Sequence, residues 1–179
     1  MRCYHFGNFY MSSIQQGIQA AHCQMELVLK YDLQSGDALA MLWDWMHNHK
    51  TMICLNGGML ADMKELWEVL DVEDNPYPYA KFHESDEAMG GMLTNIAIVL
   101  PERIYEAARF IRKQYNYLEQ KTLSTVVTDD SICNTICYKL DITSFEYDEL
   151  EKVKEFQTYE YTHFEYELIN KLNSYSLAK

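Results

Sequence analysis

Between an aromatic, strand-like opening and a long helical pattern lies the segment Ser12-Ser13-Ile14-Gln15-Gln16-Gly17-Ile18-Gln19-Ala20-Ala21-His22. Ser12 or Ser13 is a natural N-cap, because a short hydroxyl side chain accepts a hydrogen bond from a free amide of the first turn. The segment has little bulk and many hydrogen-bonding groups. We expect it to face a ligand, with ligand-binding residues Ser12, Ser13, Gln15, Gln16 and Gln19. The alternative is a plain cap with solvated glutamines and with His22 packed in the core.

The pattern of apolar residues on both sides of this segment predicts the order β-α-α-β-α-β-β over residues 1–101. Strands are expected at Cys3–Tyr10, Lys50–Leu55, Tyr79–Phe82 and Asn95–Leu100. Apolar residues at helical spacing predict helices over Ile14–Tyr31, Ala38–His49 and Leu60–Leu70. This alternation favours an α/β fold, with a mixed four-stranded sheet flanked by helices.

After Pro101 the sequence changes character. An amphipathic helix is predicted over Glu102–Gln120, followed by a less regular stretch from Thr122 to Thr143. Two further helices are predicted over Ser144–Phe156 and Thr162–Asn173. We therefore expect residues 102–179 to form a mainly helical, acidic and aromatic-rich extension, packed on the first domain or on a partner protomer.

Charge narrows the range of partners. The 179 residues carry a net charge of −12, with no run of basic residues in either half. A protein that grips a long nucleic acid normally supplies a cation for each of several phosphates, so a long nucleic acid is not an expected partner. A small ligand with a few phosphates remains compatible, because backbone amides at helix N-termini hold anions without a basic side chain.

Apolar runs and cysteines indicate which cellular environment and which bound groups to expect. The sequence has no apolar run of the ~20 residues that cross a bilayer, so no membrane partner is expected. Its five cysteines are odd in number, which is typical of reduced thiols in a cytoplasm. Cys133 and Cys137 would share a helical face without a second pair of ligands, so neither a metal nor a cofactor is expected.

Two further groups of residues suggest chemistry. Asn56, Gly57 and Gly58 join a strand to a helix, where they either contact a phosphate of the ligand or simply form a tight turn. His22 and His83, with Glu84 beside them, are the catalytic candidates if the protein is an enzyme, which would be an ester or phosphodiester hydrolase. The alternative is a set of separate structural histidines.

The motif Gln19-Ala20-Ala21-His22, the strand Asn95–Leu100 ending at Pro101, and the order of elements together resemble the type 2 peptidyl-tRNA hydrolases. The resemblance covers about residues 1–101. It implies a small α/β domain, often dimeric, that cleaves the ester joining a peptide to tRNA. A homodimer or higher homo-oligomer is therefore expected.

Carried over residue by residue, the resemblance is incomplete. The two lysines that precede the motif in that family fall on Ser13 and Gln15 here, so both cations are absent. The family's acidic position falls on His83 or Glu84, and its threonine on Thr94. The resemblance thus implies that Thr94 lines the same site.

The runs Leu55–Gly58 and Pro76–Phe82 are also similar to proteins of tailed bacteriophages. We therefore expect a phage protein, acting in the host cytoplasm, that binds a small nucleotide-type ligand in the α/β cleft. Such a protein would sequester or cleave a host immune signalling nucleotide, an anti-defence role. The alternatives are a peptidyl-tRNA hydrolase and a protein-interaction module that inhibits a host factor through the extension.

Overall fold

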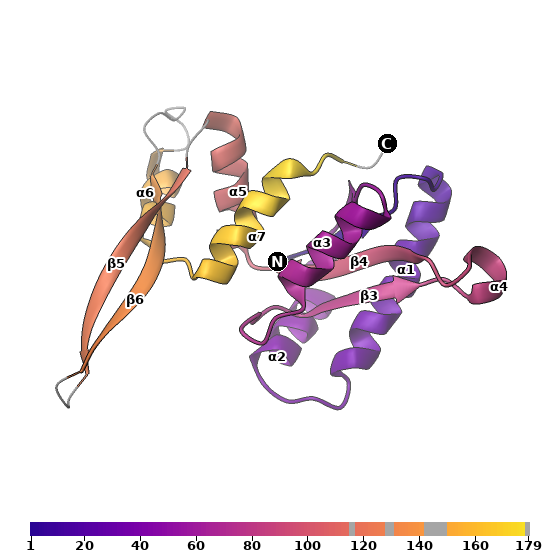
Figure 1. Cartoon of the computed structure of the whole chain (residues 1–179), viewed down its shortest axis with the longest axis horizontal. Coiled ribbons are helices and arrows are strands. Elements are labelled where there is room, and N and C mark those ends of the chain that lie inside the picture. The colour runs from indigo at the N-terminus through magenta and orange to yellow at the C-terminus, as the bar shows by residue number, and fades with distance from the viewer. Residues whose placement is uncertain (115–116, 128–130, 142–149, 178–179) are drawn as a thin grey trace. The chain divides into compact units, whose positions relative to one another are not determined.

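The computed structural model describes residues 1–114, 117–127, 131–141 and 150–177 (Figure 1). The chain divides into two compact units. Unit 1 comprises Met1–Glu102 with Tyr175–Lys179, and unit 2 comprises Arg103–Ser174. The predicted boundary at residue 101 lies one residue from this division. The C-terminal residues from Tyr175, expected in the extension, belong to unit 1 instead.

Unit 1 is built on a four-stranded sheet, as the alternating sequence pattern predicts. Its strands are β1 (Arg2–Gly7), β2 (Met52–Asn56), β3 (Tyr79–His83) and β4 (Leu93–Leu100). The strand order is β2-β1-β4-β3, with β1 parallel to β2 and the other two pairs antiparallel. The prediction of a mixed four-stranded sheet is confirmed.

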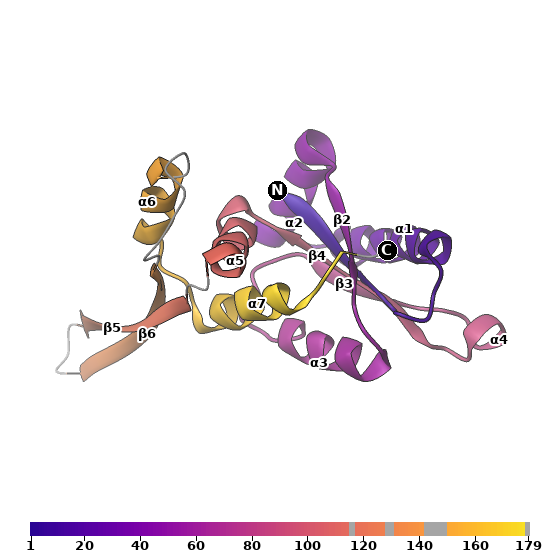
Figure 2. The ribbon, with the colours of Figure 1, turned by 90° about the horizontal axis from the view of Figure 1, so that it is seen from above.

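Helices cover both faces of this sheet. The helices of unit 1 are α1 (Ser13–Tyr31), α2 (Asp37–Asp44), α3 (Leu60–Leu70) and α4 (Asp86–Met89), and a π-helical turn, Trp45–His49, extends α2. Figures 1 and 2 show α1 along one face of the sheet and α3 along the other. With both faces covered, every residue of β4 is buried, which explains its continuous apolar run.

The core under α1 contains Cys3, Cys23, Leu27, Ala97 and Val99, all fully buried. Alternate residues of β4 point to the opposite face, toward the buried α3 side chains. The buried side chains of α1 and α3 thus pack on opposite faces of the sheet.

The C-terminal residues close unit 1 at its β2 edge. The Tyr175 ring packs edge-on against Phe6, with 4.9 Å between the ring centroids. The Asn56 N–H donates to the Ser176 carbonyl at 2.9 Å, and Leu55 forms an antiparallel bridge with Leu177. This pairing covers the outer edge of β2 with a short extended segment.

Unit 2 contains α5 (Glu102–Gln114), a hairpin of β5 (Tyr117–Val127) and β6 (Ser131–Asp141), α6 (Leu150–Thr158) and α7 (His163–Ser174). The hairpin corrects two expectations. The first helix ends at Gln114 instead of Gln120, and the stretch expected to be irregular forms paired strands. Cys133 and Cys137 therefore lie on a strand, not on a helix. Residues 144–149 of the next predicted helix lie outside the described residues.

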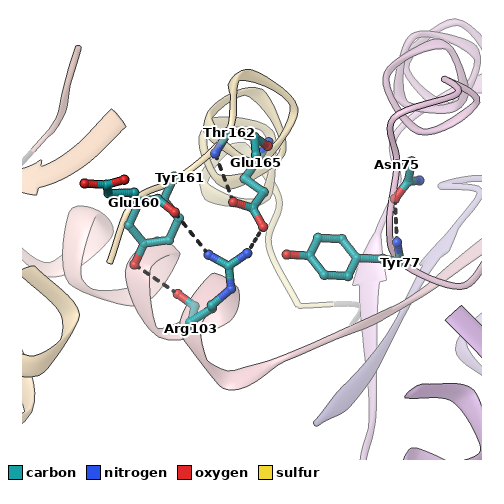
Figure 3. A network of polar contacts seen from close by, with 7 residues as sticks. All are labelled: Asn75, Tyr77, Arg103, Glu160, Tyr161, Thr162 and Glu165. Atoms are coloured by element: carbon teal, nitrogen blue, oxygen red, sulfur yellow. Dashed lines mark hydrogen bonds and ion pairs between the residues drawn. The ribbon is translucent and has the colours of Figure 1, made fainter. Parts of the chain in front are cut away.

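An ion pair to a buried carboxylate fixes the start of α7 in unit 2. Arg103 donates to the carboxylate of Glu165, whose side chain is almost completely buried (Figure 3). The Glu165 carboxylate also accepts the Thr162 N–H at 3.0 Å, while the Glu165 N–H donates to Thr162 Oγ1 at 3.2 Å. The Tyr161 hydroxyl donates to the Arg103 carbonyl at 3.4 Å. This reciprocal capping orients Glu165 toward the guanidinium.

Candidate functional site

A pocket of about 520 Å³ opens between α3 and the end of the sheet formed by β3 and the start of β4. Pockets that hold small ligands have volumes of about 300–1,000 Å³. The α3 contribution follows from helical spacing, since positions i, i+4, i+7 and i+8 share one face. The lining residues are Leu60, Lys64, Trp67, Glu68, Lys81, His83, Met89, Gly90, Gly91, Met92 and Leu93.

Cations gather at this pocket in an otherwise acidic protein. Residues 1–102 contain only five Lys and Arg residues. Two of them, Lys64 and Lys81, line the pocket. The Lys81 ammonium lies 4.1 Å from the centroid of the Trp67 ring, and that of Lys30 lies 5.8 Å from it. Burial, and then the nearby charge of Lys81, lower the pKa of Lys30, although Asp71 opposes this. An anion bound here would therefore relieve repulsion between like charges.

Asp71 fixes the Trp67 ring, which lines the pocket, together with the neighbouring Tyr79. Its two carboxylate oxygens accept from the Trp67 indole N–H at 2.9 Å and from the Tyr79 hydroxyl at 3.0 Å. The two rings lie 5.4 Å apart between centroids, and the Lys30 ammonium sits 3.3 Å from the centroid of Tyr79. Burial, and then the hydrogen bond to Asp71, raise the pKa of Tyr79 to about 12. The Trp67 ring thus lines the pocket in a fixed orientation, with the Lys81 ammonium group beside it.

His83 lines the same pocket, and a hydrogen bond orients its ring. Its Nδ1 lies 2.9 Å from the carbonyl oxygen of Gly91. A carbonyl only accepts, so Nδ1 carries the proton and Nε2 is the free acceptor of the neutral ring. Gly90 and Gly91 adopt left-handed backbone conformations, with φ of +61° and +67°, which glycine adopts without steric cost. The turn therefore positions His83 as part of the pocket.

On the opposite face, three of the sequence-predicted residues form a hydrogen-bonded chain. The Thr94 hydroxyl donates to Gln19 Oε1 at 2.8 Å, and Gln19 Nε2 donates to Glu84 Oε2 at 2.8 Å. A bulge makes this possible: Phe82 pairs with Asn95 but His83 pairs with Leu93, so Thr94 is an extra residue that turns toward α1. Of the two residues on which the acidic position could fall, Glu84 is the one that accepts a hydrogen bond from Gln19, and His83 is not.

The Glu84 carboxylate is held in its ionised form. Hydrogen bonds from the Ser85 backbone N–H and then from Gln19 lower the pKa of Glu84, and nearby His22 lowers it further. His22 packs edge-on against Phe82, 4.9 Å between ring centroids, on the α1 side. His83 lines the pocket on the α3 side. The two histidines expected to converge thus lie on opposite faces of the sheet.

The N-terminus of α1 uses most of its polar groups internally. Ser12, not Ser13, is the N-cap, and it forms a capping box in which the Ser12 N–H donates to Gln15 Oε1 at 3.0 Å. Gln16 turns inward, where its Nε2 donates to the Met11 carbonyl at 3.1 Å. Ser13 stays exposed. The structure therefore does not direct the five predicted ligand-binding side chains of this segment to one point.

The amides of the glycine turn before α3 also form hydrogen bonds within the protein. The Gly57 N–H donates to the Gly7 carbonyl at 2.7 Å, and the Gly58 N–H donates to Asn56 Oδ1 at 3.0 Å. The Asp62 carboxylate accepts the Met59 N–H at 2.8 Å, at the start of α3. The amides expected to contact a phosphate are thus already bonded, and a carboxylate stands at the helix N-terminus where an anion would bind. Of the two alternatives for this turn, the structure favours the tight turn.

A third polar group lies wholly inside unit 1. His5 Nδ1 donates to Asn95 Oδ1 at 3.0 Å, and the Cys3 thiol lies 3.3 Å from His5 Nε2. All three side chains are buried. Burial raises the pKa of the Cys3 thiol well above its usual value, so this thiol is not an activated nucleophile. The triplet is a structural network of the core.

The sequence interpretation missed Lys64, Trp67 and Lys81 as a group. Helical spacing places Lys64 and Trp67 on one face of α3, and strand alternation places Lys81 and His83 on one face of β3. These two patterns were the available signal. Across the described ranges of the chain, no cluster of three or more His, Cys, Asp or Glu side chains is arranged to hold a metal ion.

Within those same ranges, no helix has the length and apolar character needed to span a bilayer. No protein-family model and no curated protein matches this chain.

Proposed function

We propose that unit 1 binds a small nucleotide-type ligand in the pocket between α3 and β3. The proposal rests on one observation. Lys64 and Lys81 line the same pocket as Trp67, whose indole ring is fixed by Asp71 and lies beside the Lys81 ammonium group. Ammonium groups form charge-assisted hydrogen bonds with phosphate oxygens, and an aromatic face stacks on a base. This combination suits a ligand that has both groups.

The finer proposal concerns the ligand and its fate. We propose a cyclic or ADP-ribose-type signalling nucleotide, which a phage protein would sequester from a host defence system. The size of the pocket, about 520 Å³, supports a single small molecule and not a polynucleotide. The net charge of −12 supports the same choice, since the local cations are too few for a long phosphate chain.

Isothermal titration calorimetry tests the binding. The protein is titrated with ADP-ribose, cyclic di-AMP, cyclic GMP-AMP and AMP, and at least one of them binds with a saturable heat. The double variant Lys64→Met/Lys81→Met keeps the side-chain length but removes both charges, and it loses at least 10-fold in affinity. Lys154→Met removes one charge from an exposed position of α6 and leaves the affinity unchanged. Absence of binding by every nucleotide overturns the proposal.

The fate of the ligand needs a separate readout. After incubation with excess protein, the nucleotide is extracted and measured by chromatography and mass spectrometry. Sequestration returns the intact nucleotide at its starting amount. Time-dependent conversion to a hydrolysed product identifies an enzyme instead, and it contradicts the sequestering role while leaving the binding site in place.

A second candidate function is ester hydrolysis, on a peptidyl-tRNA-like substrate. It is favoured by the chain from Thr94 through Gln19 to Glu84, with His22 close by. The Glu84 carboxylate would take a proton from water while the water oxygen attacks the ester carbonyl. The bond to the ribose oxygen then breaks, and the proton passes to that leaving oxygen.

Turnover of a diacetyl-lysyl-tRNA substrate tests this candidate. Glu84→Gln removes the base while leaving an oxygen that accepts the hydrogen bond from Gln19, and it abolishes turnover if the carboxylate acts as the base. Glu87→Gln, an exposed change on α4, is the matched control and leaves turnover unchanged. A wild-type protein without turnover, or turnover that survives Glu84→Gln, excludes this candidate.

A further inference from the structure

Helix α1 is apolar on both its inner and its outer side. The inner side packs on the sheet through Ala20, Cys23, Leu27 and Tyr31. The outer side carries a second apolar set, with exposed fractions of 77% for Ile14, 49% for Ile18, 65% for Met25 and 67% for Leu29. Several large apolar side chains that are exposed together on one side of a helix mark a surface that contacts a partner.

The four outer residues form one narrow row. Their spacing of four, seven and four residues places them within about 60° of one another around the helix axis, as 3.6 residues per turn dictates. Ala21 lies in the middle of the same row and is also exposed. We call this row, Ile14, Ile18, Ala21, Met25 and Leu29, the outer stripe. It contains no charged residue and has the pattern of a helix–helix contact.

We propose that the outer stripe docks on the outer stripe of a second copy of this chain, with the two α1 helices antiparallel about a two-fold axis. The positions of the large side chains are symmetric about a single point. Ile14 and Leu29 are centred between Ala21 and His22, and so are Ile18 and Met25. A two-fold axis there places Ile14 opposite the partner's Leu29 and Ile18 opposite the partner's Met25. Ala21, at the crossing point, lets the two helices approach closely.

Charge and area also favour a second copy. Two molecules that each carry −12 repel one another, and they approach most easily through a face without charged groups. Antiparallel helices also bring opposite ends of their dipoles together. The four large side chains are each exposed over about half to three quarters of their surface, so a symmetric pair would remove apolar surface from water on both copies.

Charge substitution in the outer stripe tests the interface and its register. Ile18→Lys and Met25→Glu each place an unpaired charge in the contact, so each shifts the protein from dimer to monomer in sedimentation velocity experiments. The double variant Ile18→Lys/Met25→Glu sets each new ammonium group opposite the new carboxylate of the other copy, twice per dimer, and recovers the dimer. Within one helix these positions are seven residues apart, too far for an internal pair. Leu33→Glu, at a residue that is 96% exposed just beyond α1, is the control and keeps the dimer.

A disulfide measures the crossing point directly. Ala21→Cys lies beside its own symmetry mate, so mild oxidation converts it to a reducible covalent dimer, whereas the exposed Ala61→Cys on α3 stays monomeric on denaturing gels. Because all substituted side chains are exposed, circular dichroism is expected to show an unchanged fold. A monomeric wild-type protein, or a dimer that survives both single charge variants, overturns the proposal.

Discussion

The ammonium group of Lys81 lies 4.1 Å from the centroid of the Trp67 ring, and Asp71 fixes that ring through its indole N–H. A cation over an aromatic face is attracted by the ring quadrupole, so the two side chains form one preorganised wall of the pocket. Because the wall is organised before a ligand arrives, binding orders few side chains.

Removal of the ring is expected to weaken nucleotide binding while preserving the fold. Trp67→Leu eliminates the stacking surface, which is worth about 1–3 kcal/mol per base, so affinity falls by about 5- to 150-fold. Trp67 is only partly buried, so the thermal unfolding temperature changes little. Trp43→Leu, which alters a side chain that is 44% exposed and outside the pocket, is the control for calorimetry. Equal affinities of the two variants would remove Trp67 from the site.

Two glycines with positive φ are expected to differ in their tolerance of a side chain. Gly90 has φ of +61° and open space around its absent Cβ, so Gly90→Ala costs about 1 kcal/mol of unfolding free energy from backbone strain alone. Gly58 has φ of +80°, and a Cβ there would lie 2.8 Å from Cβ of Asp62. Gly58→Ala therefore costs more, about 2–3 kcal/mol. Urea denaturation compares them, and the reverse order would show that the turn before α3 relaxes freely.

Buried His5 is expected to make stability depend on pH. Burial lowers the pKa of His5 below its usual 6.5, although the hydrogen bond to Asn95 opposes this. The unfolded chain therefore takes up the proton first as the pH falls. The contribution of neutral His5 to the free energy of unfolding is fully present above pH 6.5. It is lost as the pH drops through the folded-state pKa, and the free energy of unfolding changes by at most about 1.4 kcal/mol per pH unit.

His5→Gln keeps a side-chain N–H for Asn95 but does not titrate. The difference in unfolding free energy between the wild type and this variant is measured by urea denaturation at pH 7.5, 6.5, 5.5 and 5.0. We expect the wild type to lose stability relative to His5→Gln only below about pH 6.5. A difference that is constant over the range would show that His5 is not protonated on unfolding.

The buried carboxylate of Glu165 is expected to be essential to unit 2. Glu165→Ala removes the carboxylate to which Arg103 donates and the acceptor of the Thr162 N–H. The Arg103 side chain is 32% exposed, so the loss is that of hydrogen bonds to a charged group, about 1.5–3 kcal/mol. Glu167→Ala disrupts only an exposed pair with His163 and costs under about 1 kcal/mol. Chemical denaturation followed by circular dichroism should separate the two variants clearly, and similar midpoints would contradict the structural role of Arg103 and Glu165.

Much of unit 1 could be predicted from the sequence, because its elements have strong periodicity. The helix over Leu60–Leu70 has the predicted bounds, and the sheet strands lie within a few residues of theirs. The β5–β6 hairpin was not predicted, although β-branched residues such as Val126, Val127 and Ile132 are typical of strands. The apolar pattern there has no clear period, and strand pairing depends on partners distant in the chain.

The candidate site was predicted only in part. Gln19, Glu84 and Thr94 lie together, in positions to which the family resemblance pointed, but the resemblance left His83 and Glu84 as alternatives. The hydrogen bond from Gln19 identifies Glu84, and the bulge that turns Thr94 toward α1 has no local signal in the sequence. Lys64 and Lys81 are far apart in the sequence, and they line one pocket only because α3 packs beside β3. Sequence patterns within single elements do not predict such a contact between elements.

The pocket contains its own reporters for a direct test of ligand binding. Met89 and Met92 line it, whereas Met25 and Met52 are exposed elsewhere in unit 1. Methyl NMR of protein labelled with carbon-13 methionine, assigned with single Met→Leu variants, is recorded during titration with ADP-ribose and cyclic di-AMP. We predict saturable shifts of the Met89 and Met92 methyl signals with at least one nucleotide, while those of Met25 and Met52 stay in place. Unchanged Met89 and Met92 signals at saturating concentrations of both nucleotides would contradict the proposed function.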